Sequence, residues 1–329
     1  GKDFTDFRRF EIPGPASNDV VHISSFNGKT ILCAGGTYGT GEGIGRPFQV
    51  SIHSSGKYEN IISGKEKDAL RCCFDPSDNS HFFISTWGSG LFEYRNNTQV
   101  NHYNNGNSPL QEGSGDITDT KICGIKFDTD GNLWIAQSNS SSSIKVLKPD
   151  GKWIILPYTV NVSGPLDLMI VAGGQKWIFQ PGTNNIFLLD DNDTPGFLSD
   201  DRYLRLPVRD TEGGLFSVFS MTEDLDGNIW VGTDKGPLVY FNPGKVFDID
   251  LTAHRIKIPR NDGSGLADFL LGTETITSIA VDGANRKWVG SSGSGVYLLS
   301  ADGNKVIETF NTGNSPMFSD SIASVAVDD

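Results

Sequence analysis

The stretch GIKFDTDGNLWIA (124–136) decides the fold, because similar stretches stand at 221–233 (MTEDLDGNIWVGT) and 279–290 (IAVDGANRKWVG). In each of the three, an Asp precedes a Trp by six residues. An alternating segment ends at an Asp/Gly/Asn turn, and a second segment opens with a large aromatic residue. Each copy is therefore predicted to form a β-hairpin.

The hairpin is part of a longer repeat. After it come a Gly-rich turn, a third apolar segment such as 293–299 and a polar fourth segment such as 305–310. Weaker copies fill the rest of the chain, and the aromatic position recurs every 43 to 58 residues. The residues at this position are Ile31, Phe83, Trp134, Trp177, Trp230 and Trp288. Four strands per repeat at this period predict an all-β fold, a β-propeller with one blade per repeat.

Six repeats are complete, and a seventh begins at 321–328 and stops before its aromatic residue. Residues 6–12 precede the first blade as 307–310 precede the seventh, so we expect them to supply an outer strand. The prediction is a single propeller domain over 1–329, with seven four-stranded blades and the last one incomplete. Six blades with loose ends are the alternative.

Composition excludes several classes of function. The chain has 27 basic and 40 acidic residues, a net charge of −13 that is unsuited to nucleic acid. No apolar stretch approaches 18 residues, so no membrane-spanning helix is predicted. Cys33, Cys72, Cys73 and Cys123 lack zinc-site spacing and are expected to be small buried residues.

Catalytic and metal-binding motifs are absent from the sequence. It has no Gly-x-Ser-x-Gly elbow, the Gly-rich run 39–46 lacks a phosphate-loop ending, and the five histidines are scattered. The repeated Trp residues are expected in the core and the repeated Asp residues in turns. A calcium site at 190–193 is a weaker alternative to a solvated acidic loop. We predict no cofactor, no metal and no enzymatic activity.

Recognition is expected in loops on a rigid ring. The longest loops, rich in Gly and poor in strand pattern, are 34–47, 104–118 and 259–274. Aromatic and Arg side chains dominate protein interfaces, so four residues are the candidate ligand or partner contacts. They are Tyr38, Arg46, Trp87 and Arg260.

The stretch EDLDGNIWVGTDKGPLVYFNP (223–243) resembles the propeller repeat of two-component regulators. More specifically, 276–329 and 74–110 resemble the PorZ-like surface propeller proteins of type IX secretion. Both segments contain Asn-Ser-Pro, at 107–109 and 314–316. The resemblance spans most of the chain and is weakest across 155–215.

This resemblance implies that the chain is the second of two propellers in a longer, multi-domain envelope protein. It implies a non-enzymatic partner of the outer-membrane sortase, with an envelope protein or a cell-surface glycan or lipopolysaccharide as its partner. The location would be extracytoplasmic, in the periplasm or on the outer-membrane surface. The alternative is a periplasmic glycan-sensing domain of a hybrid two-component histidine kinase, and the third reading is a propeller hydrolase or lyase. The resemblance assigns no site residue.

Overall fold

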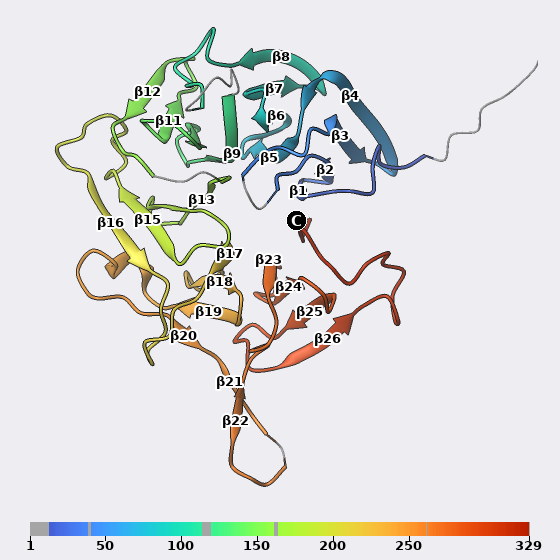
Figure 1. Cartoon of the computed structure of the whole chain (residues 1–329), viewed down its shortest axis with the longest axis vertical. Coiled ribbons are helices and arrows are strands. Elements are labelled where there is room, and N and C mark those ends of the chain that lie inside the picture. The colour runs from blue at the N-terminus through green and yellow to red at the C-terminus, as the bar shows by residue number, and fades with distance from the viewer. Residues whose placement is uncertain (1–12, 39–40, 114–119, 161–163, 261, 329) are drawn as a thin grey trace, which may run out of the picture.

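A computed structural model describes residues 13–38, 41–113, 120–160, 164–260 and 262–328. In these residues the regular structure consists of strands and one short 3-10 turn, η1 (Pro243–Lys245). The strands form antiparallel sheets arranged like spokes around a central axis (Figure 1). The predicted β-propeller is confirmed.

Among the described residues, four sheets have four strands each, and one eight-stranded sheet joins two further sets of four. Within each of these six sets, or blades, the strands follow one another along the chain from the axis to the rim. Blades 1 to 3 comprise β1 (His22–Phe26), β2 (Lys29–Cys33), β3 (Pro47–Ser54), β4 (Lys57–Lys67), β5 (Ala69–Asp75), β6 (Asp78–Gly88), β7 (Leu91–Arg95), β8 (Thr98–Tyr103), β9 (Thr120–Phe127), β10 (Leu133–Gln137), β11 (Ile144–Leu147) and β12 (Trp153–Leu156). Blades 4 to 6 comprise β13 (Asp167–Ile170), β14 (Lys176–Phe179), β15 (Asn185–Asp190), β16 (Arg202–Pro207), β17 (Val218–Glu223), β18 (Ile229–Thr233), β19 (Gly236–Tyr240), β20 (His254–Arg255), β23 (Ile276–Val281), β24 (Lys287–Ser291), β25 (Val296–Leu299) and β26 (Val306–Phe310).

The repeated Asp both shapes its turn and anchors the aromatic residue. In blade 3, Asp128 Oδ1 accepts from the N–H groups of Asp130 and Asn132, which closes the turn. Its Oδ2 accepts from the indole Nε1 of Trp134 at 2.8 Å. Blades 5 and 6 repeat the indole bond at 2.9 and 3.1 Å. The six-residue spacing is therefore a side-chain contact as well as a turn signal.

Blade 4 departs from this pattern. The strand register places Val171 where blades 2, 3, 5 and 6 have Asp, and Trp177 in the aromatic position. Trp177 is fully buried, and its Nε1 has no hydrogen-bond partner among the described residues. The same aromatic residue is therefore held here by packing alone.

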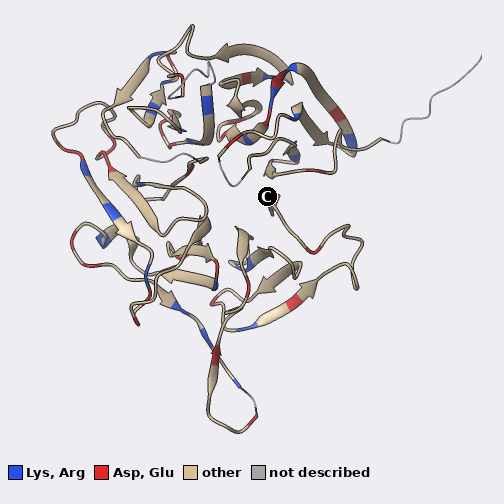
Figure 2. Ribbon diagram, viewed as in Figure 1, with Lys and Arg blue, Asp and Glu red and all other residues tan. Residues whose placement is uncertain are grey.

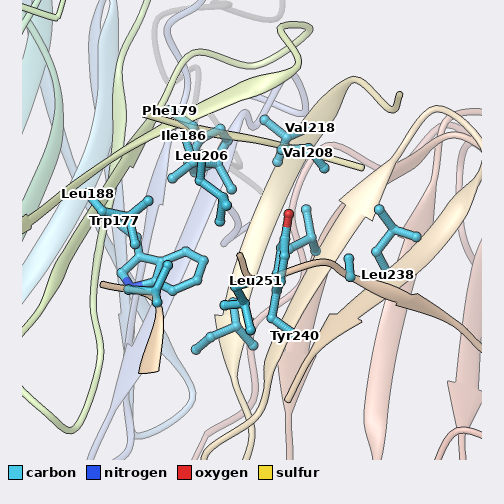
Figure 3. Packing of buried hydrophobic residues seen from close by; sticks show 14 of the residues in the cluster. Trp177, Phe179, Ile186, Leu188, Leu206, Val208, Val218, Leu238, Tyr240 and Leu251 are labelled. Atoms are coloured by element: carbon cyan, nitrogen blue, oxygen red, sulfur yellow. The ribbon is translucent and has the colours of Figure 1, made fainter. Parts of the chain in front are cut away.

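The core consists of clusters between neighbouring blades, which confirms the expected place of Trp134, Trp177 and Trp230. Trp288, also expected in the core, is only partly buried. Figure 3 shows the largest cluster, between blades 4 and 5, where Trp177 and Tyr240 meet with ring centroids 5.8 Å apart. Lysines add to two other interfaces, since Lys176 lies 4.1 Å from the Trp134 ring and Lys287 lies 4.7 Å from the Trp230 ring. Burial of these apolar faces holds the blades in a ring.

The seventh position is occupied by one extended segment, 320–328. Gly295 donates to the carbonyl of Asp320 at 2.8 Å, as Gly90 does to Thr120 of β9 at 3.0 Å. The segment therefore enters the ring as a first strand does, and it ends near the axis beside β1 (Figure 1). Six complete blades are seen, and the count of seven stays a prediction. Residues 6–12, expected as an outer strand, lie outside the described residues.

Two features differ from expectation. Segment 259–274 was expected to be an irregular loop, but β21 (Lys257–Pro259) and β22 (Ala267–Phe269) pair as a hairpin that projects from the rim (Figure 1). Gly263 and Gly265, with φ of 78° and 70°, adopt the left-handed conformations between them. In addition, β6 continues past its own blade and pairs with β9 through Trp87 and Gly88.

Candidate functional site

The three predicted loops emerge on one face of the ring. Neighbouring strands in a blade are antiparallel, so second-to-third connections and the links to the next blade lie at the same end. Loop 34–47 is of the first kind, and loops 104–118 and 259–274 are of the second. Residues 39–40, 114–118 and 261 of these loops lie outside the described residues.

Loop 34–47 brings three of the four predicted contact residues together. Trp87 Nε1 donates to the carbonyl of Gly41 at 2.9 Å, and Asp68 accepts from the N–H groups of Gly45 and Arg46. Trp87 is 3% exposed and supports the loop from below, so it offers no surface to a partner. Trp87 was expected at the end of the second strand of its blade. The strand, β6, is longer than expected and places Trp87 beneath the loop.

Tyr38 and Arg46 lie nearer the surface. Tyr38 is 57% exposed. The Arg46 guanidinium donates to the carbonyl of Gly35 at 3.1 Å and lies 3.2 Å from the carboxylate of Asp19. Arg46 therefore fixes the base of the loop, while Tyr38 is available at its surface.

Arg260 stands apart, on the projecting hairpin. Its guanidinium pairs with Asp268 across the hairpin, and its N–H donates to the carbonyl of Leu266 at 2.8 Å. The hydrogen bond from Arg260 holds the pKa of Asp268 below its usual value. The structure thus places Arg260 on the same face as the other three residues but not beside them.

The first strands of the blades surround a central cavity of about 460 Å³. Its wall includes residues from β1, β5, β9, β13, β17, β23 and the segment 323–327. Seven inner segments therefore line one cavity, which we call the channel.

A polar layer crosses the channel. In each blade, the residue at the aromatic position pairs with a residue of the first strand, and the layer residue stands two positions before that partner. Ser324 of the last segment completes the layer. Its members are His22, Arg71, Gly124, Asp167, Ser220, Ser278 and Ser324. Sequence reasoning missed these residues, although their fixed offset from the aromatic position was the signal that marks them.

Several members of the layer join one blade to the next by the same hydrogen bond. His22 Nδ1 accepts from the N–H of Cys72 at 3.3 Å. Ser278 Oγ accepts from Val325, and Ser324 Oγ accepts from Ile23 at 3.2 Å. The last segment therefore contacts blade 6 and blade 1 as a first strand contacts its neighbours.

The layer contains one ion pair, between blades that are not adjacent. Arg71 of β5 lies 3.2 Å from Asp167 of β13, and Gly124 of β9 occupies the position between them. Asp167 Oδ1 also accepts from the N–H of Leu168. This N–H group lies where a side chain at position 124 would be, so only glycine leaves room for it. Burial raises the pKa of Asp167, but Arg71 and the Leu168 N–H outweigh it and leave that pKa lowered. Burial lowers the pKa of His22 to about 3, so this imidazole is neutral.

The described part of the chain offers little evidence for a metal site or a reactive cysteine. No group of three His, Cys, Asp or Glu side chains is placed to hold a metal ion there. The four cysteines are free and buried, as predicted, and burial raises the pKa of Cys33 and Cys123 to about 12. Asp191, in the stretch considered for calcium, is buried and paired with Lys176 rather than solvated. In the same residues no helix is long and apolar enough to cross a membrane.

No protein-family model matches the chain, and no curated protein matches it in sequence. Among solved structures, the chain is similar to PorZ, an essential bacterial surface component of the type IX secretion system of Porphyromonas gingivalis. The two share 26% identity with a TM-score of 0.88, over 98% of this chain and 46% of PorZ. The chain thus spans about half the length of that protein.

Two further structures show the fold alone. The extracellular domain of the putative hybrid two-component system BT4673 from B. thetaiotaomicron is 13% identical with a TM-score of 0.58, over 97% of this chain and 37% of that one. Virginiamycin B lyase from Staphylococcus aureus is 13% identical with a TM-score of 0.60, over 91% and 87% of the two chains. The resemblance to PorZ and to a two-component regulator propeller, expected from the repeat, is therefore found in the structure as well.

Proposed function

We propose that this chain is a non-catalytic, extracytoplasmic β-propeller that serves as a binding or assembly module, similar in role to PorZ in type IX secretion. The similarity that carries this proposal is the TM-score of 0.88 at 26% identity over 98% of the chain. PorZ is a surface component of that secretion system, and the role is transferred here as a proposal.

The geometry supports a module that binds through its loop face. Inter-blade clusters and the polar layer make the ring rigid, loop 34–47 is held on it by Trp87 and Asp68, and the β21–β22 hairpin projects from it. Tyr38 and Arg260 present exposed side chains on these two elements. A rigid frame lowers the entropy that such loops lose when a partner binds.

Charge favours a protein as the direct partner. The net charge of −13 repels an anionic lipopolysaccharide and attracts a basic surface. Charged residues occur around the whole ring rather than on one side (Figure 2). We therefore favour an envelope protein over a glycan as the first partner to test.

The test is capture of envelope proteins by the immobilised propeller. Tyr38→Ala and Arg260→Ala should each weaken capture of a specific partner several-fold, because such side chains dominate interfaces. Tyr58→Ala is the matched control, since Tyr58 is 38% exposed but lies at the start of β4, next to the turn from β3 and at the opposite end of the strands. Equal capture by all three variants and the wild type would show that the loop face is not the interface.

The second candidate is a sensor domain of a hybrid two-component regulator, which the fold of the BT4673 extracellular domain supports. The parent gene distinguishes the two roles. A transmembrane helix and a kinase domain after residue 329 would favour the sensor, and a β-sandwich with a secretion-type tail would favour the PorZ-like role.

A further inference from the structure

We propose that the channel is a binding site for a small anion that carries a carboxylate or phosphate group, held by Lys126 and Arg71. This proposal is independent of the loop-face function, because the channel and the loops are separate parts of the ring. It names a ligand class that the similarity to other propellers does not supply.

The first support is the cavity itself. Its volume of about 460 Å³ falls in the range of small-molecule sites, which is roughly 300–1,000 Å³. Its wall carries charged groups and also the hydroxyl groups of Ser24, Thr277, Ser278 and Ser324. Such a wall suits a polar ligand that needs hydrogen bonds in several directions.

The second support is the sign of the charge inside the channel. Among the described lining residues, the charged side chains are Arg71, Lys126 and Asp167. His22 adds no charge, because its Nδ1 accepts the Cys72 N–H and the ring is neutral. The wall therefore carries a net charge of about +1 inside a chain of net charge −13. A narrow channel concentrates the field of such a charge.

The third support is that one of the two cations has no partner. Lys126 is an exposed residue that lines the cavity, and it makes no hydrogen bond or ion pair with any described residue. Asp167 is already engaged on both oxygens, because one accepts from Arg71 and the other from Leu168. An anion bound in the channel would supply the acceptor that Lys126 lacks.

Arg71 can add to such a site without breaking its ion pair. Its guanidinium has five N–H donors, and the described contacts use one terminal nitrogen for Leu70 and the other for Asp167. Gly124 and Lys126 are neighbours on the same side of β9, two residues apart, so the two cations lie on adjacent levels of the channel. An anion bound between these levels would accept from Arg71 on one side and from Lys126 on the other.

The experiment is isothermal titration calorimetry of the folded chain with sodium phosphate and, separately, sodium acetate at low ionic strength. We expect saturable binding of at least one of them, at one site, that weakens as chloride is added. Binding of acetate alone would identify a carboxylate ligand and binding of phosphate alone a phosphate ligand. No saturable binding of either anion would overturn the proposal.

Variants locate the site. Lys126→Gln should weaken binding about tenfold, as the loss of one charge-assisted hydrogen bond predicts, whereas Lys126→Arg should restore it to within about threefold. Lys148→Gln is the matched control, because it removes the same charge from an exposed turn of the same blade outside the channel. Equal weakening by both Gln variants would mean that bulk charge, not the channel, governs binding, and the proposal would fail. Lys126 is not on the loop face, so the capture experiment tests the proposed function without testing the channel. Failure of one proposal therefore leaves the other standing.

Discussion

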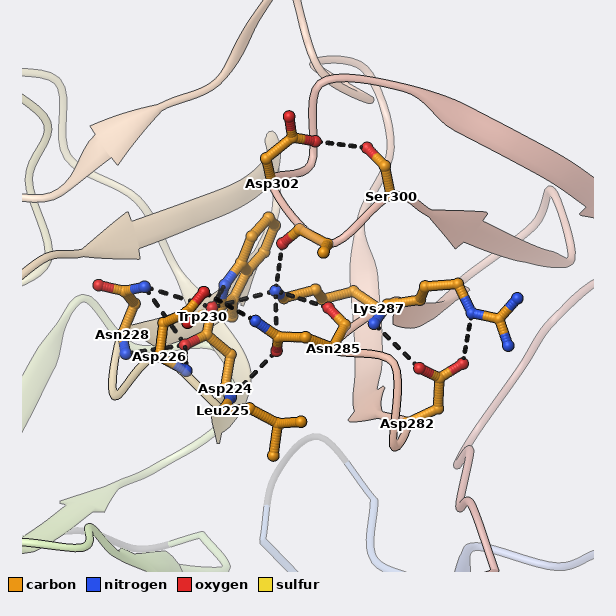
Figure 4. Close-up of polar contacts among 12 residues, drawn as sticks. Asp224, Leu225, Asp226, Asn228, Trp230, Asp282, Asn285, Lys287, Ser300 and Asp302 are labelled. Carbon is orange, nitrogen blue, oxygen red and sulfur yellow. Dashed lines mark hydrogen bonds and ion pairs between the residues drawn. The ribbon is translucent and has the colours of Figure 1, made fainter.

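Asp224 and Trp230 are joined by a hydrogen bond of 2.9 Å from the indole Nε1 to Oδ2, and the same oxygen lies 3.0 Å from the ammonium of Lys287 in the next blade. Figure 4 shows that these three side chains form the centre of a polar network between blades 5 and 6. One carboxylate therefore closes a turn, orients an aromatic residue and binds a neighbouring blade.

Asp224→Ala should lower the free energy of unfolding by about 3 kcal/mol, because it leaves the buried Lys287 without its counter-ion. Urea denaturation with fluorescence detection measures the change. Asp130→Ala is the control, since Asp130 is an exposed residue in the corresponding turn of blade 3 and its carboxylate has no described partner. It should change stability by less than about 0.5 kcal/mol. Similar losses for both variants would contradict the role of Asp224.

Val171→Asn should stabilise the protein by about 1 kcal/mol, because it supplies an acceptor for the unpaired indole N–H of Trp177. The amide carries no charge, so it avoids repulsion with Asp193, which lies against the same turn. Thermal unfolding measures the shift, and Val171→Ala reports the cost of losing the valine side chain alone. If Asn is no more stable than Ala, the missing acceptor is not what limits this turn.

Stability should depend on pH through His81. Its Nδ1 lies 2.9 Å from Asp75 and its Nε2 lies 3.0 Å from Glu93, so both nitrogens face carboxylates and the ring is an imidazolium. Burial lowers the pKa of His81, but hydrogen bonds to Glu93 and Asp75 outweigh it and leave the pKa raised, although Arg95 opposes them. His81 packs against Phe83 and Phe127, and Tyr103 bonds to the far oxygen of Glu93.

A raised folded pKa gives stability that is fully present below the ordinary histidine pKa of about 6.5 and is lost as pH rises through the folded value. Glu93 works in the opposite sense. Burial raises its pKa, yet the bonds from His81, Asn101 and Tyr103 lower it to about 2, so its contribution is lost as pH falls from about 4.5 toward 2. Urea midpoints from pH 3 to 9 should therefore peak between about pH 4.5 and 6.5. In His81→Gln the fall on the alkaline side should be smaller, and an unchanged alkaline limb would argue against a charged His81.

Gly124→Ala should destabilise the ring by about 2 kcal/mol, because its methyl group would lie 2.8 Å from the backbone N of Leu168. Gly173→Ala provides the comparison, since no atom lies within 4 Å of the added carbon. Denaturant titration of both variants measures the difference. A tolerated alanine at 124 would mean that β9 and β13 can separate without loss of stability.

The repeat predicts the architecture well because its signals are local. An Asp six residues before a Trp, with Gly and Asn between, specifies a hairpin wherever it occurs, and Trp134, Trp177 and Trp230 are buried as expected. The Asn-Ser-Pro segments are local signals as well. Asn107 and Asn314 each accept a backbone N–H three residues earlier, so both segments shape the same kind of turn.

The offset from the aromatic position marks where the polar layer lies, but the role of each member was not predictable in this way. Its members share a register position but no chemistry, since they are His, Arg, Gly, Asp and Ser. Their roles depend on which blade stands next in the ring. Arg71 meets Asp167, two blades on, because the residue between them lacks a side chain. Trp87 was misplaced for a similar reason, as its burial depends on a pairing between blades 2 and 3.

The hydrogen bond between Ile23 and Ser324 has a consequence for how the chain folds. The two residues are 301 positions apart, whereas neighbouring first strands are about fifty apart. Because the entropy of loop closure grows only with the logarithm of length, joining the ends costs only about 1.6 kcal/mol more than joining neighbours. The blades can therefore assemble in sequence from local contacts, and the ring can close as a late, inexpensive step.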